Sequence, residues 1–337
     1  MSVISRRLLL GGSVGLPLVA IQTHRADAAP VFRYRLGTNL APTHPLNVTL
    51  SKAIGQIKAR TDGRMQIMLF PNSALGSDTN MLSQIRTGAV QFFTLSGLIL
   101  STLVPEAALS GVGYAFKNYD QVWAAMDGKV GAYIRSRIAT HGLTAFEAIF
   151  DNGFRQVTTS DRPILNPADF DGLKIRVPFA ALWTSLFKDF GAVPTSINFD
   201  EVYSALQTHL ADAQENPLAI IETSKFYQVQ KCCSLTNHMW DGFWFLANPT
   251  AFEKLPAKIR GIVEEEINHA AMAERESVAA LNASLQGKLA AQGMKFNNTD
   301  SQAFRDVLIK AGFYTEWKTH FGPQAWSLLE GAVGKLG

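Results

Sequence analysis

The chain has 337 residues, of which 47% are hydrophobic and 18% are charged, a balance typical of a globular protein and not of a disordered one. This length predicts two domains with large hydrophobic cores. The formal charge is +3. It falls to about +1 without residues 1–28, which hold three basic residues and one acidic residue. A near-neutral chain argues against nucleic acid or an anionic membrane as the main partner.

The N-terminus has the pattern of an export signal. Ser5-Arg-Arg7 precedes an apolar run from Leu8 to Ile21, and Ala26-Asp-Ala28 offers small residues for cleavage. We therefore predict a signal peptide over residues 1–28, removed on export to the periplasm. The paired arginines suggest twin-arginine export, although two basic residues also serve a general signal. A membrane anchor is disfavoured because the run is short and is interrupted by glycines and by Pro17.

The cysteines and histidines indicate no framework for a disulfide or a metal. Cys232 and Cys233 are adjacent and are the only two cysteines. Neighbouring cysteines cannot form an unstrained bridge, so we interpret them as two small buried residues at a helix end. Six histidines outside the signal are scattered along the chain, and we expect neither a metal nor a cofactor.

The first part of the mature chain alternates strands with helices. Apolar periodicity and helix- or strand-breaking residues predict strands at 32–36, 65–70 and 90–95. Between them they predict two helices, one capped at Thr43 and running past Ile57, and one from Asp78 to Gly88. A β-α-β-α-β order implies parallel pairing, with helices covering the faces of the sheet.

The pattern restarts after Asp151. The predicted elements are strands at 156–158, 173–177 and 243–246, helices through Leu182 and from Asp200, one long helix over 256–293, and helices at 304–311 and 326–333. No internal repeat or low-complexity linker interrupts them.

Two polar residues stand where predicted strands end. Arg176 lies at the end of Leu173-Lys-Ile-Arg-Val177, which Pro178 stops, and Asn216 lies at the end of a second strand. The planar fork of an arginine fits a carboxylate, and strand ends are where α/β sheets bind ligands. On spacing alone, an edge-strand arginine paired with a nearby acid is the stronger alternative.

An ordered set of motifs resembles one protein family. The chain is similar to the solute-binding P subunit of tripartite ATP-independent periplasmic (TRAP) transporters, the DctP-like family. The resemblance covers nearly all of the mature chain and rests on Gly37–Asn39, Leu75–Asp78, Asn152–Gln156, Gly172–Pro178, Gly191–Thr195, Glu201–Gln207, Gln214–Pro217, Lys225–Lys231 and Thr236–His238.

This resemblance implies a fold and partners. The fold would be α/β, a two-domain periplasmic binding protein with a ligand cleft between the domains, hinge crossovers and a long helix spanning both domains. Domain 1 would comprise residues 29–152 plus about 242–280, and domain 2 residues 153–241 plus about 281–337. The partners would be a small carboxylate ligand and the membrane permease subunits of a TRAP transporter, and we expect a monomer.

The resemblance also implies roles for single residues. Arg176 matches the family arginine that pairs with the ligand carboxylate. Arg155 matches a second arginine that assists it, the alternative being a structural pair with Asp151 or Asp161.

Other matched positions complete the expected site. Asn216 would orient the ligand, the alternative being a bond to the backbone before Pro217. Phe199 would supply an apolar wall, or else pack in the core. Asn39 would face the ligand from domain 1, or else cap a turn, and Asp78 belongs to the same expected site.

The chain departs from the sialate-binding members of the family. Ser96–Ile99 carries no charge where those members have acidic or basic groups, and Phe179 replaces a small polar residue. Trp240 lies in an unusually aromatic stretch. We therefore expect Ser96, Phe179 and Trp240 at a site for an aromatic or apolar monocarboxylate, or for a small 2-oxo or 2-hydroxy acid, rather than for sialic acid.

The predicted function is capture of a small organic acid in the periplasm for a TRAP permease. The alternatives are a C4-dicarboxylate or sugar acid as the ligand, or a sensor that feeds a signalling receptor. No GxSxG, HExxH or phosphate-binding loop occurs, so we do not expect an enzyme.

Overall fold

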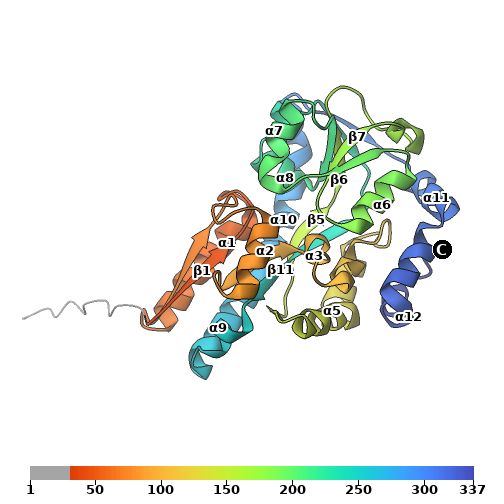
Figure 1. Cartoon of the computed structure of the whole chain (residues 1–337). Helices are drawn as coiled ribbons and strands as arrows, with labels where there is room; N and C mark the ends of the chain where they lie inside the picture. Colours follow the sequence, from red (N-terminus) through yellow and green to blue (C-terminus); the bar gives the residue numbers. More distant parts are fainter. Residues whose placement is uncertain (1–30) are drawn as a thin grey trace, which may run out of the picture.

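The computed structural model describes residues 31–337, and the predicted signal peptide lies outside this range. Two six-stranded sheets form two lobes, one above the other in Figure 1. We call the sheet with the N-terminal strand, together with its covering helices, the first lobe. The second sheet and its helices form the second lobe.

The first sheet contains the predicted β-α-β-α-β unit. Strands β1 (Phe32–Gly37), β2 (Met65–Phe70) and β3 (Phe92–Ser96) pair in parallel in the order β2-β1-β3, which confirms the predicted pairing. Strand β11 (Trp240–Ala247) then adds antiparallel to β3 and also pairs with β4 (Thr144–Ala145) and β5 (Phe150–Phe154).

The second sheet has the order β12-β10-β6-β9-β7-β8. Its strands are β6 (Gln156–Thr159), β7 (Lys174–Val177), β8 (Val193–Ser196), β9 (Ala213–Asn216), β10 (Cys232–Leu235) and β12 (Lys295–Asn298). Strand β7 is parallel to both β8 and β9, so it lies inside the sheet and is not an edge strand. The two cysteines are buried and free, as expected, but they lie in β10 and not at a helix end.

The chain passes between the lobes at three places. It crosses from β5 to β6 within two residues, returns between β10 and β11, and passes along the single helix α10 (Ala257–Ala291) to β12. Helix α10 contacts α1 and β5 on one side and α8 and β12 on the other, so the predicted long helix does span both lobes.

Further helices cover the sheets. They are α1 (Pro45–Arg60), α2 (Asp78–Thr87), α3 (Gly97–Leu100), η1 (Pro105–Gly111), α4 (Tyr119–Met126), α5 (Lys129–Thr140), η2 (Pro167–Phe170), α6 (Ala181–Asp189), η3 (Phe199–Glu201), α7 (Val202–Gln207), α8 (Leu218–Thr223), η4 (Phe226–Gln228), α9 (Pro249–Glu253), α11 (Ser301–Ala311) and α12 (Phe313–Val333). Helix α12 packs against η1, α4 and α5 as well as α6 and α11, and Figure 1 shows it beside α5. The exact domain boundaries stay a prediction.

Local chemistry explains the ends of several helices. Helix α2 begins after Ser77, whose hydroxyl accepts from the backbone N–H of Asn80, and it ends at Gly88, whose φ of 79° suits glycine. Helix α1 begins one residue later than predicted. Its cap is His44, whose Nδ1 accepts from the N–H of Leu46 at 3.2 Å, and not Thr43. Among residues 31–337, no helix is long and apolar enough to cross a membrane.

Candidate functional site

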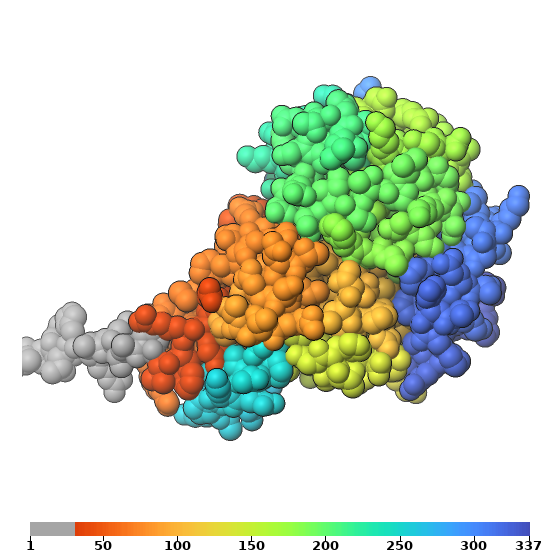
Figure 2. All heavy atoms as spheres, viewed as in Figure 1, coloured from red at the N-terminus to blue at the C-terminus, as the bar shows by residue number. Residues whose placement is uncertain are grey.

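A small cavity lies where the two lobes meet, at the ends of β1, β3, β7 and β9 and beside the crossovers. It measures about 20 Å³, room for little more than one water molecule. Thirteen residues line it: Asn39, Ser96, Ile99, Asn152, Arg155, Arg176, Pro178, Trp183, Phe199, Asn216, Ile220, Asp241 and Phe243. Figure 2 shows the surfaces of the two lobes in contact where they meet.

Arg176 retains a guanidinium nitrogen without a partner. Its side chain is 1% exposed, and its Nε and Nη2 both donate to the carbonyl oxygen of Ile197, at 2.9 and 2.7 Å. The Nη1 group is buried and has no hydrogen-bond acceptor. Burial lowers the pKa of Arg176 to about 10 despite the attraction of surrounding carboxylates. The expected alternative, an edge-strand arginine bonded to an acid, is wrong because β7 is an inner strand and the acceptor is a carbonyl.

Arg155 is held by the protein itself. Its Nε bonds to the Glu215 carboxylate, and its Nη2 donates to Glu215 Oε1 at 2.9 Å and to Asn216 Oδ1 at 2.9 Å. Its Nη1 lies 3.4 Å from Asp241 Oδ2, and the guanidinium stacks 4.7 Å over the ring of Trp183. The structural partners are therefore Glu215 and Asp241, not Asp151 or Asp161. Each of the three guanidinium nitrogens of Arg155 therefore has at least one acceptor within the protein.

Glu215 joins Arg155 to the second crossover. His238 Nε2 lies 3.1 Å from Glu215 Oε2, and His238 Nδ1 lies 2.8 Å from the Thr236 hydroxyl. Burial alone would raise the pKa of Glu215, but the charge of Arg155 and the bond from His238 outweigh it and lower this pKa. Glu215 is therefore a carboxylate that neutralises Arg155.

Asn39 and Asp78 approach from the first lobe as a bonded pair. Asn39 Nδ2 donates to Asp78 Oδ2 at 2.9 Å, and both side chains are buried. Asn39 lines the cavity, whereas Asp78 lies behind it. Burial raises the pKa of Asp78 to about 6, while the Asn39 bond and the charge of Arg176 act in the opposite direction. Asn39 Oδ1 and Asp78 Oδ1 have no donor.

Asp241 collects donors from three segments and was missed by the sequence analysis. Its Oδ2 accepts from the Ser96 hydroxyl at 2.7 Å and from Asn152 Nδ2 at 2.9 Å, in addition to Arg155. Burial raises the pKa of Asp241, and the charge of Arg155 opposes this. Asp241 Oδ1 and Asn152 Oδ1 are buried without a donor. The sequence signal was a single acid within the otherwise uncharged strand β11.

Asn216 and Phe199 both line the cavity, as expected. Both polar atoms of the Asn216 side chain have a partner, since its Oδ1 accepts from Arg155 and its Nδ2 donates to Gln214 Oε1 at 2.6 Å. Its partners are thus side chains and not the backbone before Pro217. Phe199 forms part of the apolar wall and packs edge-on against Phe226.

Trp240 and Phe179 do not line the cavity, so the expected aromatic wall is wrong for these two residues. Successive residues of a strand point to opposite faces, and since Asp241 faces the cavity, Trp240 points into the core. There its indole donates to Asp151 Oδ1 at 2.8 Å, and its ring packs edge-on against Trp123. Phe179 is 38% exposed at the surface.

Among residues 31–337, no cluster of three or more histidine, cysteine, aspartate or glutamate side chains could hold a metal ion. The cavity offers groups for hydrogen bonding and ion pairing, namely one unpaired cationic donor and several oxygen acceptors.

Known proteins share this architecture. A family model for bacterial extracellular solute-binding proteins of family 7, DctP, matches residues 36–313. An uncharacterised protein of Sinorhizobium fredii is 36% identical over 257 residues, 76% of this chain but only 47% of that protein, so the chain spans about half its length. A solute-binding protein of Roseobacter denitrificans is 31% identical over 294 residues, 87% of this chain and 90% of that protein.

Solved structures agree with the fold. The Roseobacter denitrificans protein, a TRAP periplasmic solute-binding protein with bound L-galactonate, superposes with a TM-score of 0.84 at 29% identity, over 89% of this chain and 99% of that one. A TRAP solute-binding protein of Polaromonas bound to D-erythronate gives 0.85 at 28% identity, over 89% and 98%. The two-sheet fold and the family match over 36–313 confirm the resemblance, and the chain therefore belongs to the DctP family of TRAP solute-binding proteins, which are transport proteins and not enzymes.

Proposed function

We propose that this protein binds a small hydroxylated monocarboxylate in the interlobe cavity, in the periplasm, and delivers it to a TRAP permease. The observation that carries the proposal is the buried Nη1 group of Arg176, which lacks an acceptor, whereas every guanidinium nitrogen of Arg155 has one. A ligand carboxylate would fill this position. In a buried setting such a charge-assisted bond is stronger than a surface pair.

The remaining unpaired groups define the body of the ligand. The acceptors without a donor at the cavity are Asn39 Oδ1, Asn152 Oδ1 and Asp241 Oδ1. Oxygen acceptors of this kind pair with hydroxyl groups, and a buried polar atom left unpaired costs about 1–3 kcal/mol. A 2-hydroxy acid or a short sugar acid supplies both the carboxylate and the hydroxyl donors.

An aromatic monocarboxylate fits less well, because Trp240 and Phe179 lie outside the lining. A dicarboxylate would need a second cationic donor, and Arg155 is already paired with Glu215 and Asp241. The D-erythronate and L-galactonate bound to the two related structures are hydroxy acids and support the same class.

Binding requires the lobes to separate. The cavity of about 20 Å³ cannot admit an organic acid as it stands. A wider hollow of about 220 Å³ shares Asn39 and Phe199 with it and offers a route between the lobes. We infer a hinge motion at the crossovers, with the ligand favouring the closed form through contacts that both lobes make.

Calorimetry on the mature protein tests the proposal. The ligands are D-erythronate, lactate, succinate and phenylacetate, and the variants are Arg176→Ala and Lys174→Ala. Lys174 is the matched control, because it lies on the same strand with 58% of its side chain exposed. Removing one partner of a buried charged pair costs about 2–5 kcal/mol, so Arg176→Ala should weaken binding at least tenfold.

Lys174→Ala should leave the affinity unchanged. Unaltered affinity in Arg176→Ala would remove the assigned role of this arginine. Preferential binding of phenylacetate or succinate would overturn the ligand class but not that role.

A further inference from the structure

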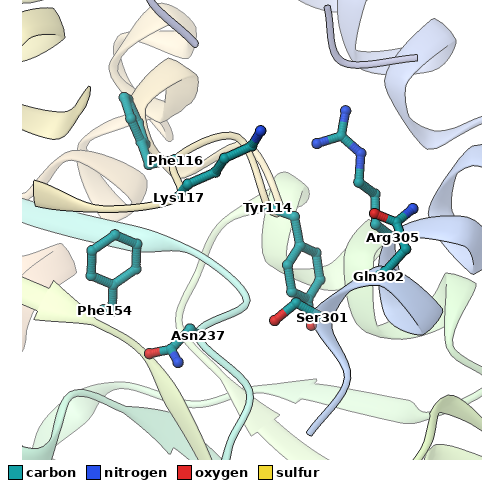
Figure 3. A pocket seen from close by; sticks show the side chains of 8 residues that line it. All are labelled: Tyr114, Phe116, Lys117, Phe154, Asn237, Ser301, Gln302 and Arg305. Atoms are coloured by element: carbon teal, nitrogen blue, oxygen red, sulfur yellow. The ribbon is translucent and has the colours of Figure 1, made fainter. Parts of the chain in front are cut away.

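A second, larger cavity lies beside the crossovers, with Phe154 and Asn237 in its lining. It measures about 360 Å³, within the range typical of small-molecule sites. Figure 3 shows its walls: the segment 114–117 after η1, Phe154 at the end of β5, Asn237 between β10 and β11, and the first turns of α11. Apart from its size, three features distinguish it from an ordinary surface hollow.

The first feature is a buried hydroxyl without a partner. Tyr114 is 7% exposed, lines the cavity, and has no hydrogen-bond partner for its hydroxyl. The ring is held in place by stacking on Phe304 at 6.3 Å and by the backbone N–H of Tyr114, which donates to the carbonyl of His238 at 2.8 Å. The ring of Tyr114 thus lines the cavity, and its hydroxyl, buried in the wall behind, is a donor that still lacks an acceptor.

The second feature is an excess of positive charge. Lys117 and Arg305 both line the cavity, and the lining contains no acidic residue. In Figure 3 their side chains stand on opposite walls, Lys117 from the first lobe and Arg305 from α11. Arg305 is oriented by its Nη2 bond to the carbonyl of Lys335 at 3.0 Å and by the ring of Tyr314 beneath it. Two cations facing one hollow favour an anionic occupant.

The third feature is the apolar part of the lining, which is made of flat rings. The rings of Phe116, Phe154 and Tyr114 form this apolar part of the lining. Aromatic side chains favour offset or edge-on packing with another ring. Together with the two cations and the free hydroxyl, these rings fit a molecule with one carboxylate and an aromatic body.

We propose that this cavity, lined by Tyr114, Lys117, Phe154 and Arg305, is a second binding site, for an aromatic carboxylate. It is separate from the hydroxy-acid site, since the two linings have no residue in common.

The position of the site couples it to the hinge. Phe154 directly precedes Arg155, and Asn237 directly precedes His238, the residue that bonds Glu215. The two crossovers are tied together at the cavity, because Gln156 Nε2 donates to Asn237 Oδ1 at 2.6 Å and the Asn237 N–H donates to Gln156 Oε1 at 3.0 Å. An occupant touching both lobes stabilises the arrangement in which its contacts exist. Occupancy therefore raises affinity in the interlobe cavity.

The test uses indole-3-acetate as the probe and calorimetry on the mature protein. We expect saturable binding that weakens at least fivefold in Lys117→Gln and in Tyr114→Phe. Both variants should fold, since Lys117 is exposed and the Tyr114 hydroxyl has no partner to lose. Lys310→Gln is the matched control, an exposed lysine on α11 outside the lining, and it should not change binding.

Arg176→Ala separates the two sites. Probe binding that survives in this variant supports the second site, and probe binding lost with Arg176 would place the acid in the interlobe cavity and overturn the proposal. Failure of the wild type to bind the probe below about 10 mM would overturn it as well. So would equal binding by wild type, Lys117→Gln and Tyr114→Phe.

The coupling, unlike the site, rests on the proposed function. Saturating probe should lower the Kd for D-erythronate at least threefold, and an unchanged Kd would refute the coupling. If the protein binds no hydroxy acid at all, the proposed function fails, while the probe titrations still decide the second site.

Discussion

Replacing Asp151 by asparagine should change how stability depends on pH. Asp151 lies on β5, is 1% exposed, and accepts from the indole of Trp240 at 2.8 Å and from the hydroxyl of Tyr119. Its backbone N–H donates to Glu274 Oε2 at 2.9 Å. Burial raises the pKa of Asp151 to about 7, although the two hydrogen bonds and the charge of Arg275 oppose the rise. The folded protein therefore keeps this carboxyl protonated well above the pH at which the unfolded chain releases the proton.

The sign and size of the effect follow from the two pKa values. Between pH 3.8 and about 7 the folded state of Asp151 holds a proton that the unfolded state has lost, so stability falls as pH rises. Over this whole window the loss amounts to about 4 kcal/mol, and between pH 5 and pH 8 to about 2–3 kcal/mol. Asparagine is neutral at every pH and keeps an oxygen for the Trp240 indole. The Asp151→Asn variant should therefore gain stability relative to wild type as pH rises.

A neighbouring acid acts in the same direction. Burial raises the pKa of Glu274 well above its usual range, and the charge of Asp151 raises it further. Removing that charge lowers the pKa of Glu274, which flattens the pH dependence of the variant still more. The difference in pH-dependent stability between wild type and Asp151→Asn thus includes a contribution from Asp151 and one from Glu274.

Urea denaturation at pH 5, 6, 7 and 8 measures the effect as the free energy of unfolding of each protein. Asp62→Asn is the control, because it makes the same change of side chain at an exposed residue whose φ of 50° asparagine tolerates. A difference between Asp151→Asn and wild type that stays constant from pH 5 to pH 8 would refute the reasoning.

Three further substitutions probe the packing of the site and of the helices. Glu215→Gln leaves the buried charge of Arg155 with only the more distant Asp241 as a counter-charge. The free energy of unfolding, measured by urea denaturation, should fall by about 3–5 kcal/mol. A fall of less than about 1 kcal/mol would contradict the pairing. Gly88→Ala places a side chain at a φ of 79° and should cost about 1 kcal/mol. Gly261→Ala, in the second turn of α10 with nothing within 4 Å of the added carbon, should instead stabilise the protein by about 0.5–1 kcal/mol. Equal effects of the two glycine substitutions would show that backbone conformation does not decide them.

Local pattern was enough to predict the elements that pair or pack with their neighbours in sequence. The apolar patterns of β1 and β2, the helix-ending Gly88 and the unbroken apolar spacing along α10 are each contained within a single stretch of sequence. Such local signals can be recognised without knowing which distant residues the segment contacts. The start of α1 was misplaced because histidine is not a common cap, although the Nδ1 of His44 accepts the same backbone hydrogen bond that a hydroxyl would.

The site was only partly predictable, because its partners come from distant segments. Both arginines could be placed near the cavity from their motifs, but which of them is paired depends on Asp241, 86 residues beyond Arg155. The orientation of Trp240 was open to sequence reasoning through strand alternation. It was misjudged because an aromatic cluster suits a pocket and a core equally well. The neighbouring Asp241, whose side chain faces the cavity and so directs Trp240 to the core, was not considered.

The contrast between the two arginines explains how one cavity can be both stable and receptive. Arg155 carries a buried charge that Glu215 neutralises and that Asn216 and Trp183 surround, so it contributes a rigid wall. Arg176 is as deeply buried, yet it bonds only a carbonyl, and burial lowers its pKa. In the hinge motion proposed above, the desolvation of this guanidinium would accompany closure of the lobes and not the arrival of a particular group on the ligand. A carboxylate that meets it in the closed form therefore gains an ion pair with a donor already fixed in direction, which favours closure around a ligand over closure without one.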